Sequence, residues 1–158
     1  MRTVAISGRG DDEVPCQRKH YAIKGNNQEV EERRKEMEYR IIIPEIPPSL
    51  NKIFNMFWAT RNKEKIRWAT IISYEINNLK RRNQLPNKIY GKVSIKIIYY
   101  FKTKANHDYD NYSGKFIMDG LKNIIIEDDN QNIVTELTHR FEYSKENPRT
   151  EIFIKEGD

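Results

Sequence analysis

Residues 108–131 have the sequence DYDNYSGKFIMDGLKNIIIEDDNQ, which concentrates acidic side chains in a chain of net charge +5. The aspartates of this stretch are Asp108, Asp110, Asp119, Asp128 and Asp129, and Lys115 lies among them. Carboxylates held close together repel one another unless a positive charge lies between them. We therefore expect the chain on either side to fold so that it supports this acidic stretch.

The middle of the stretch predicts a helix that continues to about residue 123. Asp110 or Asn111 is a suitable N-cap, because a short polar side chain can accept a hydrogen bond from a free backbone N–H of the first turn. The apolar residues that would face the core recur with helical spacing: Ile117, Leu121 and Ile124, with Phe116 beside them. Lys115, Asp119 and Lys122 would share the opposite face.

Strands are predicted on both sides of this helix. Every second residue from Val93 to Phe101 is apolar or aromatic, so residues 92–101 are predicted to form a half-buried strand. After the helix and a polar turn, Ile133, Leu137 and Phe141 predict another strand, and we expect it to pair with residues 150–155 across the turn KENPR.

The chain before the acidic stretch predicts two further elements. YRIII at residues 39–43 is typical of a strand, which the prolines of PEIPPS would end. A helix is predicted over residues 63–82, with an apolar stripe of Ile66, Ala69, Ile72, Ile76 and Leu79. Trp58, Trp68 and Tyr74 accompany this helix, and such aromatics either pack in the core or, beside basic residues, stack on nucleic-acid bases.

The composition predicts one domain with an extension. A length of 158 residues with 37% apolar content suits a single core. Residues 1–36 show no sustained helical or strand period and predict a flexible extension, with a short strand at 3–7 and a short helix at 28–37; the folded domain would span residues 37–158. A single cysteine, Cys16, excludes an internal disulfide. The apolar runs are too short to span a membrane, and we expect a soluble cytoplasmic protein.

Charge is segregated along the chain. Residues 52–104 contain thirteen Lys or Arg and two Glu, whereas residues 105–158 contain six basic and twelve acidic residues. An excess of one sign favours a polyanionic partner, because Lys and Arg near phosphates release condensed counterions on binding. The alternative is that these side chains only coat a solvated face.

The acidic stretch has three possible roles. A cluster of hard oxygen ligands suits Mg²⁺ or Mn²⁺, and in a basic chain such a site points to phosphodiester cleavage. An EF-hand is the second possibility, but Tyr112 stands at position 5 of that loop and Ser113 replaces its position-6 glycine. In the third, Asp110 only caps a helix and EDDN is only a polar turn.

The combination of DYDN, KFIMDGL and IIIEDDNQ resembles the RusA family of Holliday-junction resolvases and related phage-type endodeoxyribonucleases. IPEIPPSLNK resembles the proline-rich opening of that family, at Pro47, Pro48, Ser49 and Asn51. The resemblance covers about residues 39–154. It implies an α+β fold in which helices pack against a small mixed sheet, and the predicted order, β-α-β-α-β-β, agrees with it.

The resemblance also implies roles for individual residues. Asp108, Asp110 and Asp129 match the family's metal-binding aspartates, and Lys115 matches its essential lysine. This lysine lies seven residues after the first aspartate, where the family has six, so the Ser113–Gly114 step holds one extra residue. Supporting roles fall to Asn111, Asp119 and Asp128.

A mechanism follows from the resemblance. The aspartates would hold Mg²⁺, with Mn²⁺ as a substitute; the metal would activate a water, and Lys115 would stabilise the phosphate. A homodimer would make paired nicks in a symmetric four-way DNA junction, in recombination and repair. The residues expected to bind DNA are Lys80, Arg81, Arg82, Lys102 and Lys104. Two alternatives remain, a non-catalytic DNA-binding protein on the same scaffold and a nuclease for branched DNA in general.

Overall fold

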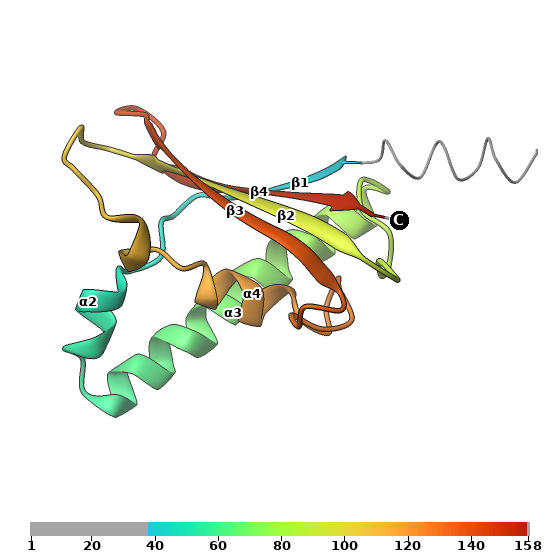
Figure 1. The fold of residues 1–158 in the computed structure, drawn as a ribbon, viewed down its shortest axis with the longest axis horizontal. Helices are drawn as coiled ribbons and strands as arrows, with labels where there is room; N and C mark the ends of the chain where they lie inside the picture. Colours follow the sequence, from blue (N-terminus) through green and yellow to red (C-terminus); the bar gives the residue numbers. More distant parts are fainter. Residues whose placement is uncertain (1–37, 158) are drawn as a thin grey trace, which may run out of the picture.

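The computed structural model describes residues 38–157, in which helices cover one face of a four-stranded mixed sheet (Figure 1). The elements in chain order are β1 (Glu38–Ile43), α2 (Leu50–Phe54), α3 (Trp58–Arg81), β2 (Val93–Phe101), the 3₁₀ helix η1 (Tyr109–Asn111), α4 (Lys115–Leu121), β3 (Val134–Tyr143) and β4 (Arg149–Glu156). The predicted α+β fold is confirmed. Cys16 and the strand and helix predicted at 3–7 and 28–37 lie outside the described residues.

The strands lie in the order β1-β4-β2-β3, with β4 antiparallel to both its neighbours and β2 parallel to β3. The predicted hairpin between β3 and β4 is therefore wrong, because β2 lies between them. β2 and β4 bury about half of their side chains, whereas β3 buries none and exposes most of its own, including Leu137. The two buried strands take the centre of the sheet, and the polar strand takes an edge.

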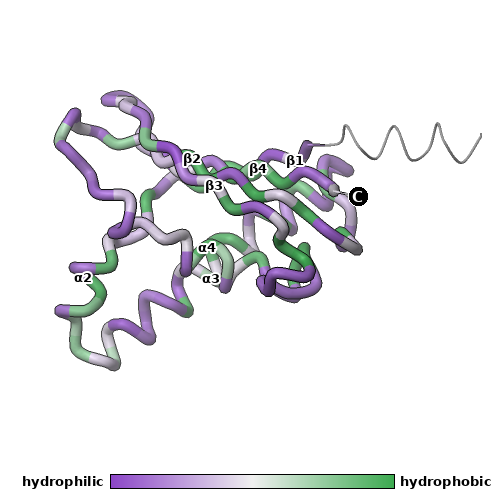
Figure 2. The backbone as a smooth tube through the Cα atoms, viewed as in Figure 1, coloured by the Kyte–Doolittle hydropathy of each residue, from purple (hydrophilic) through white to green (hydrophobic). Residues whose placement is uncertain are grey.

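The core forms between the sheet and α3. Trp68, Ile72 and Ile76 are buried on this helix, so Trp68 is a core residue. Ile66, which was predicted to belong to the apolar stripe, is 59% exposed, and α3 begins five residues before the predicted start. Figure 2 shows hydrophobic segments along the sheet and α4 and hydrophilic ones along much of α3. No helix within residues 38–157 is long and apolar enough to cross a membrane.

Gly114 sets the start of α4. It occupies the N-cap position in the left-handed conformation (φ 73°), so the N-cap predicted at Asp110 or Asn111 is wrong. A Cβ at Gly114 would lie 2.9 Å from Cδ1 of Ile97 in β2, which only glycine avoids. Lys115 is consequently the first residue of α4. The helix ends at Leu121, two residues before the predicted end.

Candidate active site

Aromatic contacts hold the chain around Asp108 and Asp110. The ring of His107 stacks on Phe101 at the end of β2, with 3.6 Å between the ring centroids. Tyr109 stacks on Phe141 of β3, with 4.4 Å between the centroids. Because Tyr109 is turned to the sheet, it does not lie between the two carboxylates. Both aspartates are exposed to solvent.

Asp108 and Asp110 have few partners among the described residues. Oδ2 of Asp108 lies 3.4 Å from Nδ2 of Asn111, at the long limit of a hydrogen bond. Asn111 is half-buried and lines a small recess with Pro47, Pro48 and Lys115. The proline-rich segment therefore packs beside the start of α4, and Asn111 lies between Asp108 and Lys115, in contact with this recess.

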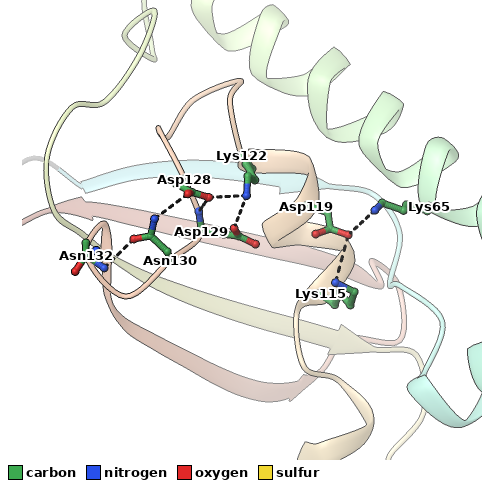
Figure 3. Close-up of polar contacts among 8 residues, drawn as sticks. All are labelled: Lys65, Lys115, Asp119, Lys122, Asp128, Asp129, Asn130 and Asn132. Atoms are coloured by element: carbon green, nitrogen blue, oxygen red, sulfur yellow. Dashed lines mark hydrogen bonds and ion pairs between the residues drawn. The ribbon is translucent and has the colours of Figure 1, made fainter.

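Lys115 lies beside Asp119, one helical turn further along α4 (Figure 3). Its Nζ is 3.7 Å from Oδ2 of Asp119, and Nζ of Lys65 in α3 is 3.4 Å from the same oxygen. Oδ2 of Asp119 is buried and accepts no hydrogen bond from the described residues. One carboxylate thus lies within ion-pair distance of two ammonium groups, which keeps the Lys115 side chain near α3 although it is 69% exposed.

Asp128 and Asp129 bind Lys122 at the other end of α4 (Figure 3). Nζ of Lys122 lies 2.5 Å from Oδ1 of Asp128 and 3.0 Å from Oδ1 of Asp129. Asp128 also accepts hydrogen bonds from the backbone N–H of Asp129 and from Asn130. The sequence placed Lys122 on the same helix face as Lys115 but did not predict this ion pair.

The two pairs of aspartates lie at opposite ends of α4: Asp108 and Asp110 before its start, and Asp128 and Asp129 after its end. In Figure 1, η1 precedes the start of α4 beside α2, and the turn that carries Asp129 follows its end. Within residues 38–157, no three His, Cys, Asp or Glu side chains are close enough to hold one metal ion. The oxygen ligands of Asp108, Asp110 and Asp129 suit Mg²⁺, but their described arrangement does not fit a common metal site.

The residues predicted to bind DNA form two separate groups. Lys102 and Lys104 follow the end of β2, and the other three lie at the end of α3, from where the chain leads to the start of β2: Lys80, Arg81 and Arg82. β2 has nine residues, so its two ends lie about 30 Å apart. Nζ of Lys80 donates a hydrogen bond to the carbonyl oxygen of Ile124, and burial lowers its pKa.

A third group of cations lines a pocket at the start of α3, which the sequence interpretation missed. The pocket has a volume of about 310 Å³, and its basic residues are Arg61, Lys65 and Lys115. Arg61 and Lys65 lie on the same face of α3 as Trp58, at helical spacing. This spacing was visible in the sequence, but the predicted helix began only at residue 63 and therefore left Trp58 and Arg61 outside it.

Comparison with known proteins identifies a family match. A family model described as Endodeoxyribonuclease RusA matches residues 45–155, which include every residue predicted for the site. The comparison with curated proteins gives no significant match. The family match begins after β1 and ends within β4, so it covers most of the described fold.

Proposed function

Because the chain belongs to the RusA family of endodeoxyribonucleases, we propose that it resolves four-way DNA junctions by paired symmetric nicks. The proposed setting is DNA recombination and repair in the cytoplasm, and the proposed active form is a homodimer, since two symmetric cuts suit a two-fold assembly. The family match supports the endonuclease activity. The junction specificity, the paired cuts and the dimer rest on the resemblance of the motifs.

The observation that carries this proposal is the position of Lys115. It starts α4, is exposed, and lies on the edge of a pocket that also contains Arg61 and Lys65. A cation held in this way can stabilise the negative charge that develops on a phosphate during cleavage. Asp119 contributes by keeping the Lys115 ammonium within reach of α3. We assign Lys115 to the scissile phosphate and the more distant basic groups to the DNA backbone.

We also propose that cleavage requires Mg²⁺, which Mn²⁺ could replace. Asp108, Asp110 and Asp129 are the proposed ligands by resemblance, with Asn111, Asp119 and Asp128 in support. A divalent cation would lower the pKa of a bound water and neutralise charge on the phosphate. Lys122 holds Asp129 in the described arrangement, so this residue would have to leave Lys122 before it could bind a metal.

The test is cleavage of a synthetic four-way junction labelled at one 5′ end, with a linear duplex of the same sequence as the control. Each DNA is incubated with the protein in Mg²⁺ and in EDTA. Symmetric nicks that are confined to the junction and need Mg²⁺ are the expected result. Equal cleavage of forks, flaps and junctions would indicate a general nuclease for branched DNA.

A non-catalytic DNA-binding protein is the second candidate. The observation in its favour is that no three carboxylates come together within the described part of the chain. It predicts binding to the junction without cleavage in Mg²⁺, Mn²⁺ or any other divalent metal. The exposed carboxylates of Asp108 and Asp110 favour the enzyme, because a binding protein gains affinity by losing negative charge near phosphates.

A further inference from the structure

Three large aromatic side chains are exposed together where α2 leads into α3. Phe54, Phe57 and Trp58 are 67%, 68% and 69% exposed. The fold does not require them: Phe57 occupies the N-cap position of α3, but its side chain accepts no hydrogen bond from the first turn, although a polar residue there would stabilise the helix by about 1 kcal/mol. Figure 2 shows that this hydrophobic segment lies away from the sheet. Exposed aromatics that do not support the fold are typical of a binding surface.

Two of these aromatics, Phe54 and Trp58, line the pocket that contains Lys115. Its apolar walls are formed by Leu50, Ile53, Phe54, Trp58 and Phe116. Its cations are Arg61, Lys65 and Lys115, and Asp119 is its acidic residue. The pocket therefore combines flat apolar surfaces with positive charge, within a volume of about 310 Å³ that suits a small planar group.

From these features we propose that the pocket binds one unpaired nucleotide of the DNA, with its base on Trp58 and its phosphate near Arg61 and Lys65. This inference rests on the proposed function and names the part of the substrate that the site recognises. A nucleotide carries the two properties that the pocket offers to a ligand, because every base has a flat aromatic face and every phosphate is an anion.

An unpaired nucleotide fits better than a base pair. In a duplex, the neighbouring pairs cover both faces of each base, so an exposed tryptophan cannot stack on it without opening the helix. Where strands exchange at a branch, bases can leave the stack at a lower cost. The pocket adjoins Lys115, so a nucleotide bound there would place the next phosphate beside that lysine.

The chain contains its own fluorescent reporter. It has two tryptophans; Trp58 is 69% exposed, and Trp68 is fully buried. In a Trp68→Phe variant, all tryptophan fluorescence comes from Trp58. If that variant does not fold, the natural protein can be used, because iodide preferentially quenches the fluorescence of an exposed tryptophan. Stacking of a base on Trp58 quenches its fluorescence. We expect quenching by a four-way junction and by single-stranded DNA, but little by an intact linear duplex of equal length.

Substitution gives the second readout. We expect Trp58→Ala to weaken junction binding between about 5-fold and about 150-fold, the range for one base stacked on an aromatic side chain, and Trp58→Phe to retain most of the affinity. The matched control is Tyr90→Ala. Tyr90 is 71% exposed beside Lys88, but it follows the end of α3, whereas Trp58 is the first residue of this helix, which is about 36 Å long. Its loss should leave junction binding unchanged.

The outcomes separate this inference from the function on which it rests. If the junction is cut but Trp58 is neither quenched nor needed for binding, the inference is wrong and the nuclease assignment stands. If the protein binds no DNA, both fail. If Trp58→Ala changes the oligomeric state measured by light scattering, or if iodide cannot reach Trp58 in the free protein, then a second copy or another segment of the chain covers the aromatics and the nucleotide site is rejected.

Discussion

Nζ of Lys122 lies 3.0 Å from Oδ1 of Asp129, so an internal cation already neutralises a carboxylate that is proposed to bind a metal. The hydrogen bonds with Asp128 and Asp129 raise the pKa of Lys122 well above its usual range. In return, the hydrogen bond from Lys122, followed by those from the backbone N–H of Asp129 and from Asn130, lowers the pKa of Asp128 well below its usual range. A divalent cation must compete with this ammonium group.

Replacing Lys122 by Gln should therefore increase the affinity for Mn²⁺. The substitution removes the competing charge from both carboxylates, and the pKa of Asp128 should rise toward its ordinary value because its strongest hydrogen-bond donor is lost. Isothermal titration with Mn²⁺ and carbon NMR of the aspartate carboxyls measure the two effects. Lys145→Gln, in the β3–β4 connection, removes the same charge elsewhere and should change neither quantity. Unchanged or weaker Mn²⁺ binding in Lys122→Gln would contradict the proposed competition between Lys122 and the metal.

Replacing Asp110 by Asn should abolish cleavage of the four-way junction and leave binding intact. Asp110 is exposed, so the substitution removes a charge without disturbing the core. Cleavage and gel-shift assays on the same DNA measure the two properties. Glu146→Gln is the matched control, because it removes one exposed carboxylate from the β3–β4 connection. Cleavage at the normal rate by Asp110→Asn would remove Asp110 from the catalytic residues.

Replacing Lys115 by Met should slow cleavage of bound junction DNA by about 100- to 1000-fold, which is typical for the loss of one group that stabilises transition-state charge. Single-turnover kinetics at saturating protein isolate this step. Lys65→Met is the control, because it also removes a cation from Asp119. It should weaken DNA binding more than it slows cleavage. An unchanged rate of cleavage in Lys115→Met would show that Lys115 contributes only to binding.

Replacing Gly114 by Ala should destabilise the fold by more than the same change at Gly91. Both glycines have positive φ, which costs an alanine about 1 to 2 kcal/mol. At Gly91 the new Cβ meets nothing within 4 Å, whereas at Gly114 it lies 2.9 Å from Ile97 and 3.1 Å from His139. Urea denaturation measures both free energies of unfolding. Equal losses would show that Ile97 and His139 move aside at no cost.

Replacing Glu151 by Gln should lower stability at neutral pH by about 2 kcal/mol. Glu151 is 1% exposed and accepts hydrogen bonds of 2.6 Å from Arg40 and from Arg149. Burial raises the pKa of this carboxyl, but the two arginines outweigh burial and lower the pKa below its usual value. Its stabilisation is thus complete above pH 4.5 and is lost as the pH falls below that value.

Thermal unfolding between pH 3 and pH 7 measures this dependence. The natural protein should lose stability toward acid more steeply than Glu151→Gln, which has no carboxyl to protonate at that position. Glu142→Gln, on the exposed strand β3, should follow the natural curve. Parallel curves for the natural protein and Glu151→Gln would contradict the stabilising role of the two arginines.

Local patterns predicted much of the fold. The alternation from Val93 to Phe101 gave the limits of β2 to within a residue, because each buried side chain there faces the same core. The start of α3 was missed because no polar cap or apolar period marks Trp58. The wrong partner for β3 has a different cause: its turn to β4 resembles a hairpin, and only the burial of both β2 and β4 excludes that pairing.

The site was predicted by residue type and less well by position. The four-residue spacing placed Lys115 and Asp119 on one helix face, and the structure agrees with it. The predicted N-cap at Asp110 or Asn111, however, put Lys115 inside the helix, whereas it is the first residue of α4. Sequence spacing could not show whether Asp129 lies near Asp110. The position of the turn that carries Asp129 depends on the length of α4 and on the ion pair with Lys122. Neither is encoded in the aspartate motif alone.

The pairing of β1 with β4 determines when the protein can fold during synthesis. Glu38 lies opposite Lys155, so the first described strand cannot pair until the last one has been synthesised. β2 also lacks its antiparallel neighbour until β4 has been synthesised. Contacts between such distant positions slow folding, because a long loop must close before they form. The ribosome therefore releases the basic residues 52–104 before the sheet can form completely. Loss of β4 would separate β1 from the β2–β3 pair.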